Sequence, residues 1–103
     1  MTAAPTTATL AIHHDPVRHR FTAEVDGHSC LLTYRPSGSH VVFDHTGVPA
    51  ALQGRGLAAQ LVQAGLDWAR SEGVKIDPAC SYVRVYLQRH PESQDLWWRP
   101  EQV

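Results

Sequence analysis

A glycine-containing segment near the middle of the chain has the composition of a phosphate-binding loop. It consists of Gln53, Gly54, Arg55, Gly56, Leu57 and Ala58, and a stretch with helical periodicity begins at its end. The first turn of a helix leaves backbone N–H groups unpaired and carries a positive potential, and glycines let a ligand approach that backbone closely. The segment therefore predicts a phosphate site, to which Arg55 adds a cation. The alternative is that the glycines only shape the loop that enters the helix.

Two classes of cofactor fit these glycines. The spacing of Gly54, Gly56 and Ala59 matches the dinucleotide fingerprint G-x-G-x-x-A, and Asp77 follows at about the distance, roughly 20 residues, that this fingerprint requires. In dinucleotide-binding folds, however, the loop directly follows its strand, whereas residues 47–52 intervene here and include Pro49. A small dinucleotide-binding protein is therefore the remoter alternative.

Two further side chains, Cys80 and His45, have the chemistry of a catalytic group. Cys80 follows Asp77 and Pro78, where a strand ends and a helix is expected to begin, and a helix N-terminus makes a thiol more nucleophilic by lowering its pKa. His45 carries an imidazole, the side chain most often used as a general base. The alternatives are a small buried core residue for Cys80 and a strand-end histidine bonded to backbone for His45.

The first half of the chain has the pattern of an antiparallel meander. Alternating segments at 20–25, 29–35 and 41–46 are separated by the turn signals Asp26-Gly27 and Pro36-Ser37-Gly38. A weaker strand is expected over residues 9–13, before Asp15-Pro16.

The pattern changes to a helical one in the second half. Residues 57–72 carry an apolar stripe at steps of three and four, and Gly73 stands where a helix would end. Residues 74–76 predict a short strand. Residues 81–88 fit either a strand or a helix, and His90-Pro91 ends them. A sheet followed by a helix, a strand and another element is an α+β order.

Length, charge and cysteine content narrow the class of protein. The 103 residues suffice for one domain, expected at 9–98 between a disordered tail at 1–8 and a short tail at 99–103. The net charge of −1 and the absence of an apolar run of about 20 residues favour neither nucleic acid nor membrane as a partner. We expect a cytoplasmic protein whose cysteines, Cys30 and Cys80, are reduced, and no Cys/His spacing resembles a metal site.

The glycine loop also resembles the acyl-CoA motif of GCN5-related N-acetyltransferases, in which Gln or Arg is followed by two residues, Gly, one residue, and Gly or Ala. Gln53, Gly56 and Ala58 match it. Further matching segments occur in order: Arg20-Phe21, Asp26-Gly27, 32–35, His45-Thr46 with Val48-Pro49, 54–58, 78–83 and 89–91. Over about residues 10–96 the chain is similar to the minimal acetyltransferase-like members of that superfamily.

This resemblance implies a single-domain α+β fold, with a mostly antiparallel sheet that splays where the cofactor enters. An acyl-CoA-binding helix follows the fourth strand, from about Arg55 to Glu72, and the residues after Cys80 are helical. The cofactor implied is acetyl-CoA or CoA, with pantetheine along residues 43–48. The residues implied to bind it are Thr46, Val48, Gln53, Gly54, Arg55, Gly56, Leu57 and Ala58.

The activity that the resemblance implies is acetyl transfer to a small-molecule or peptide amine, by a monomer or weak homodimer. Cys80 and His45 are placed near the active site, with Cys80 either carrying the acetyl group or lining the acceptor pocket. Tyr82 and Tyr86 are possible general acids, or else pack in the core. Many relatives carry a larger residue, often Glu, at the position of Gly47, which implies a different substrate or rate here. The alternative function is a CoA-binding module without catalysis.

Overall fold

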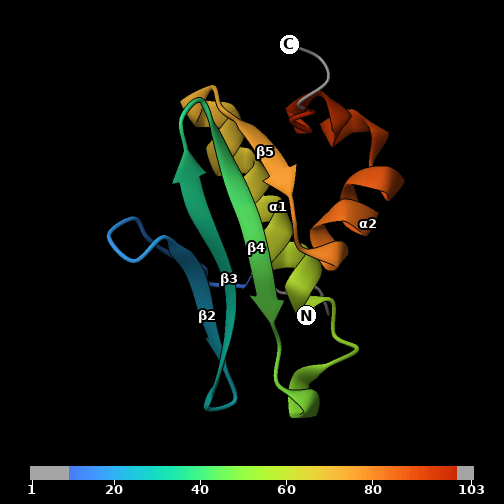
Figure 1. Ribbon diagram of the computed structural model, residues 1–103. Coiled ribbons are helices and arrows are strands. Elements are labelled where there is room, and N and C mark those ends of the chain that lie inside the picture. The colour runs from blue at the N-terminus through green and yellow to red at the C-terminus, as the bar shows by residue number, and fades with distance from the viewer. Residues whose placement is uncertain (1–9, 100–103) are drawn as a thin grey trace, which may run out of the picture.

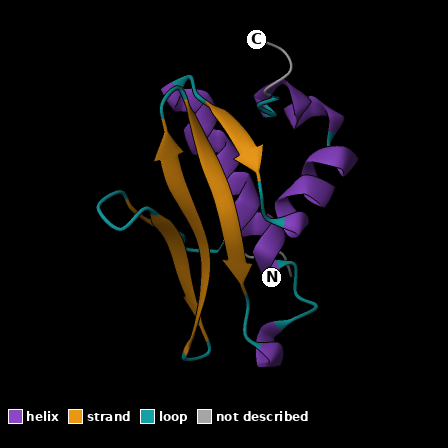
Figure 2. Cartoon of the chain, in the orientation of Figure 1, coloured by secondary structure: helices purple, strands orange, loops and turns teal. Residues whose placement is uncertain are grey.

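The computed structural model describes residues 10–99 of the chain. The expected tail at 1–8 and nearly all of the one at 99–103 lie outside the described residues. Within the described part, a five-stranded sheet is covered on one face by the long helix α1 (Figures 1 and 2). The predicted α+β class and its mostly antiparallel sheet are confirmed. No helix among residues 10–99 is long and apolar enough to cross a membrane.

The strands follow one another across the sheet in sequence order. They are β1 (His13–Asp15), β2 (Arg20–Val25), β3 (His28–Ser37), β4 (His40–Gly47) and β5 (Lys75–Pro78). The pairs from β1 to β4 are antiparallel, and β5 pairs with β4 in parallel. The meander and the α1 crossover to β5 therefore match the predicted order of elements.

The β2–β3 hairpin turns at the predicted dipeptide. Asp26 has φ 51° and Gly27 has φ 77°, and Val25 pairs with His28 around them. Two consecutive residues with positive φ match the right-handed twist of the flanking strands, which is why Asp-Gly is favoured at this turn.

The strand expected at residues 9–13 was wrong in position, because β1 starts only at His13 and runs to Asp15. The Asp15 carboxylate accepts hydrogen bonds from the backbone N–H groups of Val17 and Arg18, both at 3.1 Å, so the turn begins at Asp15 and the strand extends to it. The apolar side chains of Leu10 and Ile12 pack against the core without forming a strand.

The helices occupy the second half of the chain. They are the short 3-10 helix η1 (Ala50–Leu52), α1 (Leu57–Glu72), α2 (Ser81–Arg89) and the 3-10 helix η2 (Pro91–Leu96). Helix α1 begins at Leu57, slightly later than the expected start near Arg55, because Gly56 has φ 75° and cannot continue a right-handed helix. The ambiguous segment after Cys80 is helical, as the family resemblance implied.

Helix α1 packs very closely on β3 and β4 at Gly65. A Cβ atom at this position would lie 2.8 Å from Phe43 Cε2 and 2.9 Å from Leu32 Cδ2, so there is no room for any side chain. Leu32 and Phe43 are fully buried there. Because Gly65 has no side chain, α1 and the loop at its N-terminus can lie this close to the sheet.

Candidate active site

Strands β4 and β5 separate partway along their length. They pair from His40 with Lys75 to Phe43 with Pro78, and the Cys80 N–H then donates to the Phe43 carbonyl at 2.9 Å. Beyond this point β4 continues beside β3 alone, while the other chain turns into α2. The splay implied by the resemblance is therefore present. It leaves the β4 edge after Phe43 with backbone groups that have no β5 partner.

A β-bulge at the start of the splay decides which way the β4 side chains face. The register between β3 and β4 shifts between Thr33 and Tyr34, so that Asp44 is the extra residue. Its carboxylate accepts hydrogen bonds from Thr33 Oγ1 at 2.5 Å and Arg35 Nε at 3.3 Å.

Beyond the bulge, neighbouring β4 residues face opposite sides of the sheet. Thr46 lies opposite the buried Leu32 and faces α1, whereas His45 lies opposite Thr33 and faces away from α1.

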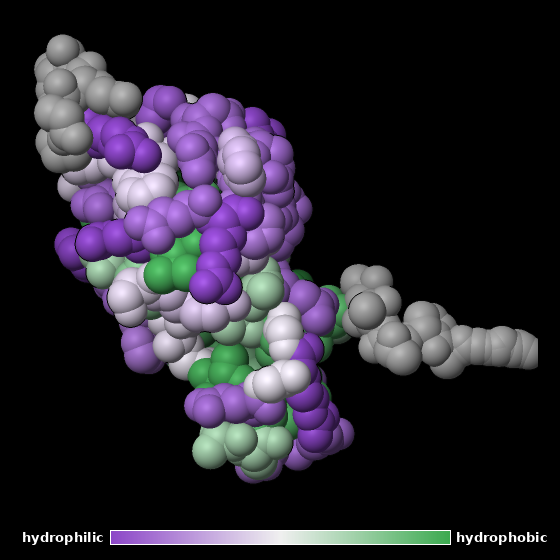
Figure 3. Space-filling view, turned by 90° about the vertical axis from the view of Figure 1, so that its right-hand side faces the viewer, coloured by the Kyte–Doolittle hydropathy of each residue, from purple (hydrophilic) through white to green (hydrophobic). Residues whose placement is uncertain are grey.

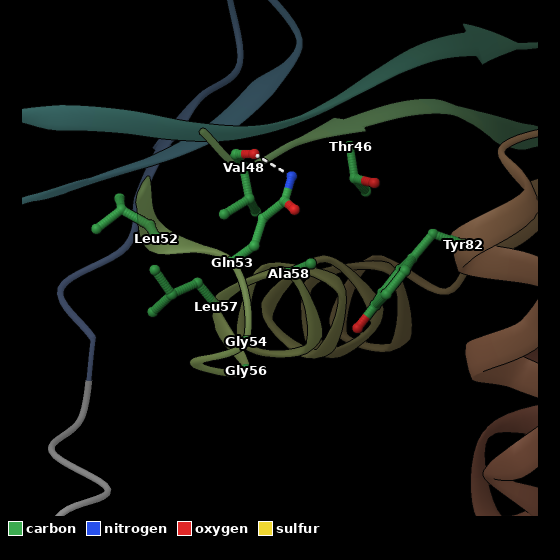
Figure 4. Close-up of a pocket in the computed structure, with 9 residues that line it drawn as sticks. All are labelled: Thr46, Val48, Leu52, Gln53, Gly54, Gly56, Leu57, Ala58 and Tyr82. Atoms are coloured by element: carbon green, nitrogen blue, oxygen red, sulfur yellow. Dashed lines mark hydrogen bonds between the residues drawn. The ribbon is translucent and has the colours of Figure 1, made fainter. Parts of the chain in front are cut away.

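A cavity of about 420 Å³ lies between the splayed end of β4 and the N-terminus of α1 (Figure 4). Viewed from the α2 side, apolar surface is exposed among polar side chains in the central and lower parts of the molecule (Figure 3). The residues that line the cavity are Thr46, Val48, Leu52, Gln53, Gly54, Gly56, Leu57, Ala58 and Tyr82. Seven of the eight predicted cofactor-binding residues are thus brought together, and Arg55 is not among them.

The glycine loop leaves the helix N-terminus open toward this cavity. Gly54 and Gly56 have φ 87° and 75°, and a Cβ atom on either would have no other atom within 4 Å. The first bond of α1 runs from the Gln60 N–H to the Gly56 carbonyl at 3.2 Å, so the N–H groups immediately before Gln60 have no helical acceptor. These donors and the positive end of the helix dipole suit an anionic group.

Gln53 and Arg55 hold the loop in place from two sides. Gln53 Nε2 donates to the Val48 carbonyl at 3.2 Å, which ties the two ends of the η1 connection together (Figure 4). Arg55 Nη1 lies 3.0 Å from Asp26 Oδ2 in an exposed ion pair with the β2–β3 turn. The guanidinium that we predicted as a phosphate ligand therefore contacts the hairpin in this structure.

The side chains of the two predicted catalytic residues lie on different sides of the sheet. Cys80 Sγ lies 3.8 Å from Thr46 Oγ1, next to the cavity but not in its lining. His45 is exposed on the opposite face of β4. Gly47 shares that face, since a Cβ at Gly47 would lie 3.3 Å from His45 Nε2. A larger side chain at Gly47 would therefore press against the imidazole.

The two tyrosines of α2 have different surroundings. Tyr82 lines the cavity, is 39% exposed, and has its pKa raised by burial, so its phenol stays protonated at neutral pH. Tyr86 donates its hydroxyl to Gln63 Oε1 at 2.5 Å and stacks on His90, so it belongs to the packing between α1 and α2. Of these two tyrosines, Tyr82 is therefore the one placed to exchange a proton with a ligand in the cavity.

Sequence reasoning missed Leu52 as a lining residue. Its side chain is buried, and it belongs to the η1 turn that closes one end of the cavity. The signal that could have indicated Leu52 is a large apolar residue in a connection that otherwise has the composition of a loop. In residues 10–99, no cluster of His, Cys, Asp and Glu side chains could hold a metal ion.

Comparisons with known proteins bear on the fold and on the family of the chain. A family model described as GCN5-related N-acetyl-transferase matches residues 20–96. Protein NATD1 of Gallus gallus and of Homo sapiens are each 34% identical to the chain over 90 residues, covering 84% of it and 82% and 80% of their own lengths. The solution structure of a GCN5-like protein from Staphylococcus aureus superposes with a TM-score of 0.70 at 26% identity, over 88% of this chain and 90% of that one.

Proposed function

The chain belongs to the GCN5-related N-acetyltransferase family, and we propose that it binds acetyl-CoA in the cavity at the splay and transfers the acetyl group to an amine. The observation that supports this most is the coincidence of two features. The unpaired edge of β4 and the open N-terminus of α1 border one cavity. The antiparallel meander in front of the loop also favours CoA over a dinucleotide, because dinucleotide-binding folds use a parallel sheet of βαβ units.

The residues present fit CoA in their shape and their donors. The glycine loop offers the space of two missing side chains beside the N–H groups of the first α1 turn, which suits the diphosphate. Thr46 and Val48 offer a strand edge along which an amide-containing arm could form hydrogen bonds. Leu52 and Leu57 add apolar surface. The volume of about 420 Å³ lies within the range of small-molecule sites.

Acetyl-CoA would supply the acyl group as a thioester, and the chain would position it and move protons. Tyr82, with its protonated phenol at the cavity, would donate a proton to the leaving sulfur. His45, on the face away from α1, would accept a proton from an amine that approaches from that side. The splay between β4 and β5 would connect the two sides.

Cys80 fits the role of a residue that lines the site better than that of an obligatory nucleophile. Its thiol lies beside Thr46 at the splay, but His45, the candidate base, leaves β4 on the other face. Cys80 is the N-cap of α2, and a helix N-terminus can activate a thiol. A nucleophilic thiol also uses a neighbouring base, however, and direct transfer to an amine needs no covalent intermediate.

Calorimetry with acetyl-CoA, CoA and NAD tests the binding half of the proposal. Acetyl-CoA and CoA should bind and NAD should not; NAD binding without CoA binding would refute it. The catalytic half is tested by acetyl-CoA consumption with a panel of small amines and amine-bearing peptides. Binding without turnover on any amine would instead favour the alternative, a CoA-binding module without catalysis.

A further inference from the structure

A second cavity, of about 310 Å³, lies at the C-terminal end of α1. It is lined by Pro16, His19, Tyr34, Pro36, Gly38, His40, Val41, Trp68, Glu72 and Val74. The cofactor cavity lies at the other end of this helix, whose 16 residues span about 24 Å along its axis. The two cavities share no lining residue, so the second one is separate from the proposed acetyl-transfer site.

Four of the ten residues that line this second cavity carry aromatic rings, namely His19, Tyr34, His40 and Trp68, and of these Tyr34 is only 4% exposed. The rings of Trp68 and Tyr34 lie 4.9 Å apart between centroids, and that of His19 lies 5.4 Å from Tyr34. The Tyr34 hydroxyl is held by His14 Nε2 at 2.6 Å, which fixes the phenol ring. The faces of such rings carry negative electrostatic potential and attract cations that lie within about 6 Å.

Charged groups around the cavity also favour a cation. The side chain of Glu72 lines it, and no ion pair of Glu72 is present among residues 10–99. The C-terminal end of α1 adds the negative end of the helix dipole.

Nearby cations are engaged elsewhere. Arg18 pairs with Asp15 at 3.3 Å, Arg70 pairs with Asp95 at 2.8 Å, and Lys75 Nζ donates to the Asp95 carbonyl at 2.7 Å. Burial and then the Asp15 carboxylate raise the pKa of Tyr34, so its phenol stays neutral beside the cavity. The described lining therefore holds the Trp68 ring and the Glu72 carboxylate, no lysine or arginine, and two histidines, His19 and His40.

We propose that this cavity binds a small organic cation with an alkylated ammonium group, held by the ring of Trp68 and by the Glu72 carboxylate. The Trp68 ring would contact the methyl groups, the buried Tyr34 ring would hold Trp68 in place from behind, and Glu72 would neutralise the charge. The volume is at the lower end of the range for small-molecule sites. This inference does not depend on CoA binding.

Choline and its neutral isostere 3,3-dimethylbutan-1-ol provide the test, because they differ in charge and hardly in shape. Each is titrated into the ¹⁵N-labelled full-length protein, and the indole N–H signal of Trp68 and the backbone signals of residues 68–74 are followed. We expect choline to bind with a dissociation constant of about 1–10 mM and the isostere to bind at least about fivefold more weakly. Glu72→Gln should weaken choline binding about two- to fivefold, whereas Glu24→Gln, on the distant β2–β3 hairpin, should not.

Several outcomes would overturn the proposal. Equal affinity for choline and the neutral isostere would show that charge is not recognised, and no change at Trp68 would show that nothing binds there.

Trp68→Phe should retain choline binding and Trp68→Leu should lose it, with circular dichroism confirming that both variants fold. Glu72→Gln should leave CoA affinity unchanged, which separates this test from that of the proposed function. A trimethyl-lysine amide that binds more tightly than choline would identify the ammonium group as that of a peptide side chain.

Discussion

Cys80 Sγ and Thr46 Oγ1 lie 3.8 Å apart at the point where β4 and β5 separate. The bond from the Cys80 N–H to the Phe43 carbonyl holds the cysteine there, beside the proposed path of the pantetheine arm. Cys80 is half-buried, whereas the other cysteine, Cys30, is completely buried and has its pKa raised by burial. The two thiols should therefore differ in reactivity, and bound CoA should change only one of them.

We expect iodoacetamide to modify Cys80 in the native protein, and saturating CoA to slow that modification at least about threefold by covering the splay. Mass spectrometry of the intact protein over time measures both rates. Cys80→Ala should take up no label, because Cys30 is inaccessible. It should also retain direct transfer to any amine that the wild type acetylates. A Cys80 inert to the reagent would contradict its place at an accessible site, and a stable acetyl group on Cys80 would support the nucleophile role instead.

Gly56→Glu should reduce the affinity for CoA at least about 100-fold, or by about 2.7 kcal/mol. The new side chain would occupy the open space of the loop with a negative charge beside the diphosphate. The free energy of unfolding should fall by only about 1–2 kcal/mol, the cost of a side chain at a left-handed backbone position. Gly38→Glu is the matched control, since Gly38 also has positive φ and open surroundings but lies on the β3–β4 turn. Wild-type affinity in the Gly56 variant would remove this loop from the site.

Tyr82→Phe should keep the affinity for CoA within about twofold but slow acetyl transfer by about 10²-fold or more, because it removes the proposed proton donor and little else. Tyr86→Phe is the comparison, since its hydroxyl is engaged with Gln63 away from the cavity. Burial raises the pKa of Tyr82 from its usual value of about 10. Deprotonation of Tyr82 should therefore cause no loss of activity below about pH 10. The rate of acetyl transfer to one amine is measured across a range of pH for both variants. A fully active Tyr82→Phe protein would show that another group donates the proton.

Gly65→Ala should destabilise the fold by about 1–3 kcal/mol through overpacking against Phe43 and Leu32. The effect should appear even though alanine is the better helix former by about 1 kcal/mol. Chemical denaturation followed by circular dichroism measures it. Ala64→Gly, at the neighbouring half-buried position, gives an upper limit for the propensity term and should cost about 1–2 kcal/mol, because its methyl group also packs against the core. A stabilised Gly65→Ala protein would show that α1 can move away from the sheet without penalty.

The stability of the protein should depend on the protonation of His14. Burial lowers the pKa of His14, whose ring stacks on Phe21 at 4.2 Å. The folded state thus binds a proton less tightly than the unfolded state, whose pKa is about 6.5. This contribution to stability is present above about pH 6.5 and is lost as the pH falls through the lower folded pKa.

His14→Gln should show a smaller loss of unfolding free energy between pH 7.5 and pH 5 than the wild type does. His13→Gln, at the exposed neighbouring position of β1, should keep the wild-type pH dependence. Urea denaturation at the two pH values measures the difference. An unchanged slope in His14→Gln would assign the acid sensitivity to other groups.

The sequence alone sufficed for most of the local elements and for the position of the glycine loop. Alternation over residues 20–25 and 29–35 around Asp26-Gly27 specifies a hairpin, because a period of two and a turn of positive φ are local properties. The apolar stripe over residues 57–72 likewise predicts a helix, whereas the left-handed Gly56 that sets its first residue was seen only in the structure. The family resemblance settled residues 81–88, whose own pattern fitted both a strand and a helix.

Only the tertiary structure decided how these elements combine into a site. The bulge at Asp44 depends on the register between β3 and β4, and it places His45 and Thr46 on opposite faces. Arg55 pairs with Asp26, which lies 29 positions earlier in the chain, and does not line the cavity. Tyr82 lines the cavity because of the way α2 packs. Periodicity describes neighbours along the chain. Contacts such as these depend on the packing of residues distant in sequence, so local pattern does not specify them.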